Sequence, residues 1–278
     1  MTKISFFDRR VIDNFLKITA AISATLSLLV LFVDIPVNYK TTLGWIFVGF
    51  LALIYLVIWI WSNNLNKIDI NIEGSEVTIK VGDIFSEPGL KAIAFNEYFD
   101  TTVDNKIISE NSLNGIFIKK YLGDPISELD RHIDNYSFDE SEKLESNTER
   151  ALGKKLRYQI GTICVYGDFL LAAFTKFDNN NKAVLTMPEY LEFLINFWDR
   201  VNNVYGQQSV ATPVFGSGIT RIKGHKTISD EDLLKIMLWT FRISEMRFKY
   251  PAKLTIVIHR DKIDKINLLD IKSARNGV

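Results

Sequence analysis

Four short segments of this 278-residue chain carry residue types that could bind a small molecule. The first reads GDIF, at 82–85, and follows an apolar stretch. Its Asp83 carboxylate is an acceptor-only group that could take a hydrogen bond from the exocyclic amine of a nucleobase. An aspartate is also a common cap of a helix or turn, and the sequence leaves both roles open for Asp83.

The second segment reads AFNEYFDT and also follows an apolar stretch. Asn96 offers both a donor and an acceptor, and the rings of Tyr98 and Phe99 could stack on a base or a ribose. Glu97 and Asp100 could act as acid and base, as paired carboxylates do in glycoside cleavage. Acidic pairs are common in loops, so binding without catalysis is the alternative for this segment.

Two glycine-containing segments could hold a phosphate. In SLNG, at 112–115, a glycine near a helix start lets the backbone approach an anion. In TPVFGSGIT, at 212–220, Gly216, Ser217 and Gly218 could form a nest of N–H donors. Gly-x-Gly also occurs in plain turns. Ser217 lies outside a G-x-S-x-G pattern, so we predict no nucleophilic catalysis there.

The composition excludes several other functions. Lys and Arg number 33, as do Asp and Glu, so no basic field exists to bind nucleic acid. There is one cysteine, Cys164, and the three histidines are far apart in the sequence. Neither an HExxH motif nor a paired CxxC is present. We therefore predict no metal site, no cofactor and no nucleic-acid partner.

Two apolar stretches precede all four segments. Leu43–Trp61 has no charge over 19 residues, and as a helix it would span roughly 29 Å, the thickness of a bilayer core. Phe15–Val33 carries one charge, Lys17, near its start. A buried core helix is the alternative for Leu43–Trp61, but this stretch keeps no polar stripe. A cleaved signal peptide is the alternative for Phe15–Val33, but no cleavage site follows Val33. We predict two transmembrane helices joined by the loop 34–42.

The basic residues predict the orientation of this hairpin. Most flank its two ends, and only Lys40 lies in the loop. The positive-inside rule then places both termini in the cytoplasm. We expect a two-helix anchor over 1–66 and a cytoplasmic domain over 67–278. Four hydroxyl side chains of the first helix could line a contact between helices or bond their own backbone: Thr19, Ser23, Thr25 and Ser27.

The remainder is predicted to be an α/β domain. Several predicted strands are apolar on both faces, which favours a central mixed sheet between two helix layers. The polar stretch 135–156 is predicted as a surface loop or a short solvated helix. Strands are predicted at 67–71, 77–81, 90–95, 162–166, 169–175, 209–214 and 254–259, and helices at about 112–121, 186–204 and 229–246. Capping boxes mark the starts of the last two helices, formed by Thr186 with Glu189 and by Ser229 with Asp232.

Together the four segments resemble a known family. The order strand-GDIF, strand-FNEYFDT, SLNG-helix and TPVFGSGIT is similar to that of macro domains, which are ADP-ribose-binding α/β modules. More narrowly, two transmembrane helices ahead of this arrangement resemble the membrane-macro effectors of type II Thoeris antiphage systems. The resemblance covers nearly the whole chain and implies a three-layer, macro-like α/β/α domain behind the hairpin.

The resemblance also implies roles for individual residues. Asp83 would meet the adenine amine, Ile84 would lie against the base, and Asn96 with Asn114-Gly115 would border the distal ribose and the diphosphate. The loop 215–219 would contact the second phosphate. The ligand-binding residues predicted in this way, together with those predicted from residue type, are Asp83, Ile84, Asn96, Tyr98, Phe99, Asp100, Asn114, Gly115, Phe215, Gly216, Ser217, Gly218, Ile219 and Thr220.

The chain departs from the macro pattern in its first loop. Macro hydrolases often have an Asn-rich loop that runs into several glycines, whereas here an insert from Glu97 to Leu113 interrupts it and only Gly115 remains. This difference favours binding over hydrolysis. The insert could also recognise a group attached to the distal ribose.

The resemblance implies a ligand-gated membrane effector that is not an enzyme. A TIR-domain enzyme would convert NAD into an ADP-ribose-type signal, of the histidine–ADP-ribose class, that the cytoplasmic domain binds. Binding would favour a homo-oligomer whose clustered hairpins disrupt the lipid membrane. A membrane-tethered macro hydrolase that removes ADP-ribose is the main alternative, and an anchored scaffold without a ligand is the third.

Overall fold

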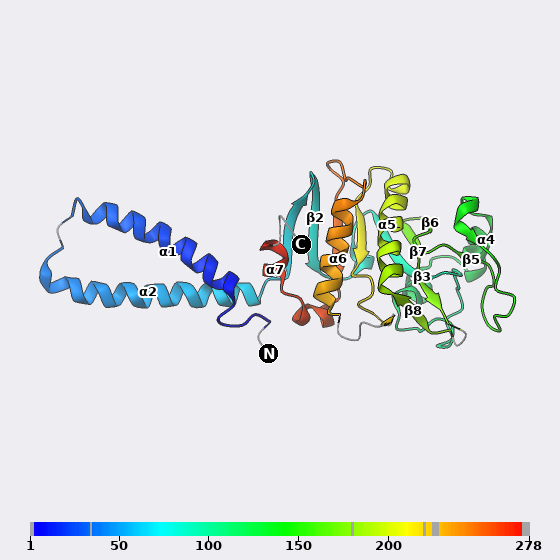
Figure 1. The fold of residues 1–278 in the computed structure, drawn as a ribbon, viewed down its shortest axis with the longest axis horizontal. Helices are drawn as coiled ribbons and strands as arrows, with labels where there is room; N and C mark the ends of the chain where they lie inside the picture. The colour runs from blue at the N-terminus through cyan, green and yellow to red at the C-terminus, as the bar shows by residue number, and fades with distance from the viewer. Residues whose placement is uncertain (1–2, 34, 179–180, 219–220, 224–227, 274–278) are drawn as a thin grey trace. The chain divides into compact units, whose positions relative to one another are not determined.

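The computed structural model describes residues 3–33, 35–178, 181–218, 221–223 and 228–273. The chain forms two compact units (Figure 1). The helical unit comprises the described residues up to 66 together with those from 266 onward, and the sheet unit comprises 67–265. The helical unit contains α1 (Arg9–Val30), α2 (Val37–Asn63) and the short α7 (Leu268–Ser273).

Helices α1 and α2 form the predicted hairpin, with different bounds (Figure 1). The first helix begins at Arg9, six residues before the predicted start at Phe15, because Asp8 caps it and accepts a hydrogen bond from the Arg10 N–H at 2.9 Å. The second begins just after Pro36, so most of the predicted loop 34–42 is helical. Hydropathy marks the apolar stretches, whereas the Asp8 cap and Pro36 mark where the two helices begin.

Both helices are long and apolar enough to cross a membrane. Only 6% of the most apolar window of α1 and none of that of α2 is buried, which differs from the core helix of a soluble protein. For Thr25 of α1, the prediction that the hydroxyl bonds its own helix backbone is confirmed, since it donates to the Ala21 carbonyl oxygen at 2.9 Å. The hairpin therefore exposes a large apolar surface that water would solvate poorly.

Helix α7 packs at the base of the hairpin, although it comes 200 residues later in the chain. Leu269 is 5% exposed and forms a buried cluster with Ile4 and Val11. Asp270 forms an ion pair with Arg10, which belongs to the first turn of α1. The two ends of the described chain therefore belong to the same unit.

The sheet unit is built on a mixed sheet, as predicted. Its strand order is β1-β2-β11-β9-β3-β7-β8-β10, and β6 pairs with β7. The four strands β2, β11, β9 and β3 are mutually parallel neighbours, and β7 continues the parallel set beyond β3. The strands are β1 (Lys67–Ile72), β2 (Ser75–Val81), β3 (Leu90–Asn96), β6 (Ile163–Tyr166), β7 (Phe169–Phe177), β8 (Ala183–Thr186), β9 (Val210–Pro213), β10 (Arg221–Lys223) and β11 (Leu254–Ile258), while β4 (Lys143–Leu144) and β5 (Arg157–Tyr158) form a separate pair.

Helices cover both faces of this sheet. Alternate residues of β7 point to opposite sides, so Phe174 contacts the ring of Phe193 on one helix, at 4.6 Å between centroids, whereas Leu171 and Phe117 share a cluster on the other face. The predicted capping boxes at Thr186 and Ser229 are confirmed. The helices are α3 (Leu113–Ile116) with the π-helical turn Phe117–Tyr121, α4 (Ile126–Asn135), α5 (Met187–Val204) and α6 (Asp230–Ile243), with short 3-10 turns at Ile84–Ser86, Glu140–Glu142 and Arg260–Lys265.

Some short elements were not predicted from the sequence. Helix α4 buries only Leu129 and Ile133 in ten residues, too few to give a clear helical period. Strands β8 and β10 have four and three residues and lie at the edge of the sheet. Their pairing comes from tertiary contacts and leaves little local pattern.

We predict that Leu269→Ala loosens the base of the hairpin. Removing a buried leucine side chain from the cluster with Ile4 and Val11 should lower the stability of that contact by about 2 kcal/mol. The measurement is amide hydrogen exchange of residues 4–11 in detergent-solubilised protein, which should speed up. Lys272→Ala, on an exposed position of the same helix, is the control, and equal exchange in both variants would contradict the packing role.

Candidate functional site

Three of the predicted segments lie at one edge of the sheet. Because β2, β11, β9 and β3 are parallel, their carboxyl ends meet at the same edge, where ligands bind in open α/β sheets. Asp83 follows β2, Asn96 ends β3 and the loop 214–218 follows β9. With β11 between them, β2 and β9 are about 10 Å apart. That distance suits a ligand with a base at one end and a diphosphate at the other.

Asp83 caps the first 3-10 turn and is exposed. Its carboxylate accepts a hydrogen bond from the Phe85 N–H at 3.0 Å. The preceding Gly82 N–H donates to Ile258 at 3.1 Å, so the strand pairing continues up to this turn. A carboxylate has room for several donors, and no second donor to Asp83 occurs among the described residues. The capping role is confirmed, and it leaves a carboxylate oxygen for a ligand.

Ile84 connects the GDIF segment to the neighbouring strands. It is 5% exposed and forms a buried cluster with Ala211 of β9 and Val257 of β11. Phe85 and Leu113 pack against this cluster. The turn after β2, the start of α3 and the strand before the glycine loop therefore share one small core beneath the edge of the sheet.

Asn96 is buried and uses its side chain within its own segment. Its Oδ1 accepts from the Tyr98 N–H at 3.0 Å and the Asp100 N–H at 3.3 Å, while its Nδ2 donates to Asp100 Oδ2 at 3.0 Å. These contacts close a tight turn after β3. The described contacts of Asn96 therefore support a role in shaping the loop, and direct contact with a ligand stays a prediction.

Asp100 belongs to a buried ion pair that sequence reasoning missed. Arg150 donates to Oδ1 at 3.1 Å and to Oδ2 at 2.7 Å, and the Lys154 N–H donates to Oδ1 at 2.7 Å. The side chains of Asp100 and Arg150 are 1% and 6% exposed. The Arg150 guanidinium also lies 3.8 Å from the centroid of the Tyr98 ring. The loop around 150 thus fastens the segment 96–101 in place.

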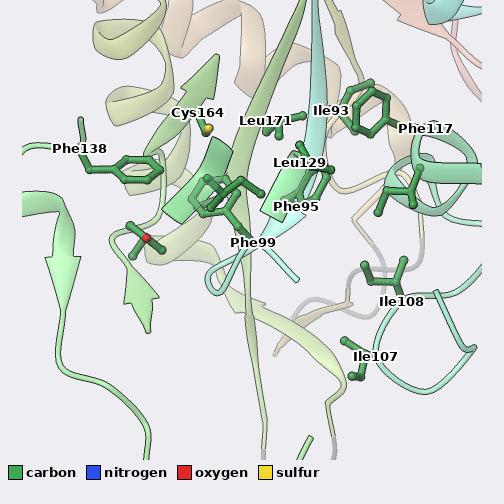
Figure 2. Packing of buried hydrophobic residues seen from close by; sticks show 14 residues of the cluster. Ile93, Phe95, Phe99, Ile107, Ile108, Phe117, Leu129, Phe138, Cys164 and Leu171 are labelled. Atoms are coloured by element: carbon green, nitrogen blue, oxygen red, sulfur yellow. The ribbon is translucent and has the colours of Figure 1, made fainter. Parts of the chain in front are cut away.

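The two aromatic residues of this segment are interior residues. Figure 2 shows Phe99 beside Phe95 and among the packed side chains that include Phe138. Phe99 has a φ of +48° and no exposed surface, and Tyr98 is 2% exposed. The Tyr98 hydroxyl oxygen accepts from Asn147 at 3.1 Å. Their burial gives no support to stacking on a ligand, so that role remains an untested prediction.

Glu97 is also buried, at 3% exposed. Its Oε1 accepts from the Phe177 N–H at 3.2 Å, and its Oε2 has no partner among the described residues. Burial raises the pKa of the Glu97 carboxyl, and the Phe177 hydrogen bond and nearby basic side chains only partly offset this effect. Neither Glu97 nor Asp100 therefore presents its carboxylate to solvent. Their burial gives no support to the prediction that they act together as acid and base.

Gly115 has a steric reason to be glycine that we did not predict, and its contact with a phosphate stays a prediction. A Cβ at this position would lie 2.2 Å from the Ser109 carbonyl oxygen, so the backbone that approaches closely belongs to the chain itself. Ser112 caps α3 by accepting from the Gly115 N–H at 3.2 Å. Asn114 is buried, and its Oδ1 accepts from the Ser112 hydroxyl at 2.6 Å. This segment is a compact helix start packed against its own insert.

The glycine loop after β9 is anchored from behind. The Tyr190 hydroxyl donates to the Phe215 carbonyl oxygen at 2.9 Å, and Phe215 is 1% exposed. Gly216 has a φ of +85°, and a Cβ there would lie 3.3 Å from Leu233. Gly218 is exposed. In the described part of this loop, Ser217 donates its hydroxyl to Val214 at 2.7 Å, whereas the Gly216 and Gly218 N–H groups have no partner.

The ring of Phe215 faces the core, so only its backbone can serve the loop. Ile219 and Thr220, which we also predicted to bind ligand, lie outside the described residues. The loop therefore retains the positive-φ glycine and the free donors that an anion-binding nest requires, from Gly216 to Gly218.

The sequence matches define the class to which this arrangement belongs. A family model described as "Thoeris protein ThsA, Macro domain" matches residues 77–259, so the sheet unit is a macro domain. The "Thoeris protein ThsA" of Bacillus amyloliquefaciens (strain Y2) is 40% identical over 269 residues, which cover 95% of this chain and 89% of that protein. The chain belongs to the Thoeris ThsA family, as its sequence motifs indicate.

Solved structures also resemble the chain. The macrodomain of Oceanobacillus iheyensis with ADP is 13% identical, with a TM-score of 0.40, and the match covers 75% of this chain and 94% of that one. A mutant of the same macrodomain with ADPR gives the same identity and TM-score, with 75% and 96% covered.

We predict that Gly115→Ala destabilises the sheet unit. Overlap of the new methyl group with the Ser109 carbonyl should lower the free energy of unfolding by about 1–3 kcal/mol. Thermal unfolding followed by circular dichroism should show a fall of several degrees in Tm. Gly123→Ala is the matched control, because nothing lies within 4 Å of a Cβ there, and a Tm as low in Gly123→Ala would contradict the explanation.

Proposed function

We propose that this protein is a membrane effector of Thoeris antiphage defence that binds an ADP-ribose-type signal. Its macro domain would face the cytoplasm, and the signal, of the histidine–ADP-ribose class, would come from a TIR-domain enzyme. Binding would drive assembly into a homo-oligomer whose hairpins disrupt the bacterial inner membrane. The observation that carries the proposal is the family match over nearly the whole chain, with the exposed Asp83 and the glycine loop at one edge of the sheet.

The contacts at this edge support a ligand-binding role for part of the predicted site. Asp83 would accept the adenine amine while it still caps its turn, and the Gly216 and Gly218 N–H groups would donate to a phosphate. Ile84 would support the base from below, since it is buried in the cluster shared by β9 and β11. Asn96, Asp100 and Arg150 would act by holding the loop beside the ligand.

The proposed mechanism places a requirement on binding energy. A ligand that shifts an assembly from 1:99 to 99:1 must bind the assembled state more tightly by roughly 5.5 kcal/mol. Hence the ligand has to contact groups that are arranged differently in the two states. We propose that these groups include the part of the insert around Ser109, which packs against the start of α3.

Membrane topology is part of the proposal. We propose that the hairpin within 1–66 anchors the protein, that both termini lie in the cytoplasm, and that the chain from 67 onward forms the cytoplasmic region. Helix α7 belongs by its contacts to the base of the hairpin, so this anchor would include a short C-terminal element.

We expect Asp83→Asn to weaken binding of ADP-ribose about 10- to 100-fold, because an amide replaces a charged hydrogen-bond acceptor. Asparagine caps turns as well as aspartate does, so the fold should persist. Isothermal calorimetry gives the Kd, and the Tm without ligand checks the fold. Asp168→Asn, an exposed aspartate at the opposite edge of the sheet, should bind like the unchanged protein. Equal affinity in both variants would remove Asp83 from the site.

We further expect the full-length protein in liposomes to release an entrapped dye when an extract of phage-challenged, TIR-containing cells is added. Asp83→Asn liposomes should leak much less with the same extract, and an extract from unchallenged cells is the control. Absence of leakage from correctly inserted protein would contradict the effector role.

The alternative is a tethered macro hydrolase, and the same reagents separate it from an effector. Mass spectrometry after incubation with ADP-ribosylated protein or with the extract reports whether the compound is recovered intact. Stoichiometric recovery supports a receptor, whereas turnover supports the hydrolase. Glu97 and Asp100 are both buried, which supports a receptor over a hydrolase that would use this acidic pair.

A further inference from the structure

The segment ahead of α1 folds back beside the end of α2 (Figure 1). Residues 4–7 read ISFF and are followed by Asp8, the cap of α1. We name these four residues the hook. At one end of the hook, Ile4 is 1% exposed and belongs to the buried cluster that contains Leu269. At the other end, Phe7 is 78% exposed. The hook is therefore anchored at its start and presents a large apolar ring at its tip.

Side chains of α2 satisfy the backbone of the hook. The Ile4 N–H donates to Asn63 Oδ1 at 2.9 Å, and Trp59 Nε1 donates to the Ile4 carbonyl oxygen at 3.1 Å. The Tyr55 hydroxyl donates to the Phe6 carbonyl oxygen. Tyrosine and tryptophan each have one side-chain donor, and both donors here go to irregular backbone. Irregular backbone needs such direct partners where water is scarce, as it is inside a bilayer.

The aromatic rings of the hook and of α2 form one group. The ring of Phe6 lies 4.9 Å from that of Tyr55, 5.5 Å from that of Trp59 and 5.1 Å from that of Phe7, measured between centroids. Phe6 and Phe7 are therefore held at the level of Tyr55 and Trp59 along α2. The depth of these two α2 residues gives the depth of the hook.

The position of these rings along α2 corresponds to the boundary of a bilayer core. Lys40 is the last charged residue of α2, and the sequence has no further charge until Lys67. Tyr55 and Trp59 come 15 and 19 residues after Lys40. At 1.5 Å per residue they lie about 22 and 28 Å along the helix from it. Because a bilayer core is about 30 Å thick, Trp59 lies near the far boundary and Tyr55 just inside it when Lys40 is at the near one.

From these contacts we propose that the hook inserts into the cytoplasmic boundary of the lipid bilayer, held there by α2, with the Phe7 ring among the outer parts of the acyl chains. The inference rests on the proposed function, because it takes the hairpin to be inserted with this end toward the cytoplasm. Aromatic side chains gather at this boundary because their rings are apolar and their polar groups can still find partners.

The apolar surface around this level of the hairpin favours lipid as the partner of Phe7. Leu56 and Ile60 of α2 lie between the levels of Tyr55 and Trp61 and are 42% and 51% exposed. These side chains face lipid once the hairpin is inserted, and Phe7 extends the same kind of surface at the same depth. A lipid partner therefore covers the hook and α2 together.

The charge next to the hook lies on the polar side of this boundary. Arg9 is exposed and precedes Phe15 by six residues in the sequence. Because the Phe15 ring contacts that of Tyr55 at 5.3 Å between centroids, Arg9 lies about 9 Å further out than Tyr55 along α1. An apolar tip inside and a cation outside is the arrangement by which amphipathic segments bind the surface of a membrane with anionic lipids.

A fluorescent label at the tip of the hook tests its depth. Full-length Phe7→Cys is labelled with the environment-sensitive dye NBD and reconstituted into phosphatidylcholine–phosphatidylglycerol liposomes. A lipid with a nitroxide near the headgroup end of its acyl chain should quench this label strongly. Asn66→Cys, an exposed position beyond the end of α2, is the matched control and should be quenched several times less. The native Cys164 stays unlabelled, because it is buried and burial raises its pKa to about 12.

Two results of this experiment would overturn the proposal. One is equal quenching at the two positions, which would place the hook in water. The other is a blue-shifted emission from the label at Phe7 without quenching by the nitroxide lipid, which would mean that protein covers the tip.

Removal of one hydrogen bond tests whether α2 holds the hook in the lipid. Trp59→Phe keeps a ring but removes the donor to the Ile4 carbonyl oxygen, and an unpaired carbonyl is unfavourable in apolar surroundings. In chains that also carry the label at Phe7→Cys, Trp59→Phe should reduce the quenching several-fold. Trp61→Phe is the matched control, because the Trp61 side chain is 50% exposed and donates no hydrogen bond among the described residues. Equal quenching in the two variants overturns this part of the proposal.

Two further measurements separate the hook from the proposed function. Alkaline carbonate extraction reports membrane insertion, and calorimetry with ADP-ribose reports binding by the macro domain. Protein that resists extraction and binds ADP-ribose, but whose label at Phe7→Cys escapes quenching, overturns only the hook. Protein that carbonate extracts from the membrane overturns both.

Discussion

The parallel pairing of β2, β11, β9 and β3 is the constraint on which the candidate site depends. Backbone hydrogen bonds fix the register of these four strands, and parallel strands must end at the same edge. The segments GDIF and FGSG, 133 residues apart in the chain, are therefore held about two strand spacings from each other. The shared cluster of Ile84, Ala211 and Val257 then fixes the turn after β2 onto its neighbours.

The loop after β3 is held in place by a separate set of buried contacts. The buried pair of Asp100 and Arg150 joins two segments 50 residues apart, and Asn96 closes the turn that leads from β3 to Asp100. Removing either partner of such a pair would leave a buried charge without compensation. The loop beside the ligand edge is thus held by polar contacts on one side and by the Phe99 cluster on the other. A rigid loop of this kind can hold a recognition surface in place without contributing each of its side chains to it.

The sequence predicted the elements better than the roles of individual side chains. Strands such as β2 and β11 have strong apolar patterns, and the capping boxes at Thr186 and Ser229 gave two helix starts. The family and the class of the fold followed from the motifs. Residue type could not distinguish a ring that stacks on a ligand from one that packs in the core, as with Phe99. Arg150 gave no signal because its partner is distant in sequence. The close approach of the Ser109 carbonyl to Gly115 likewise could not be predicted from residue type.

The packing of α7 against the base of the hairpin has a practical consequence for protein engineering. Since Leu269 is covered by Ile4 and Val11, the sheet unit is joined to the helical unit at both of its ends, after Asn66 and before Ile266. A water-soluble fragment for crystallisation should therefore be trimmed on both sides, from Lys67 to Lys265. Retaining α7 in such a fragment would uncover the apolar surface of Leu269 and invite aggregation.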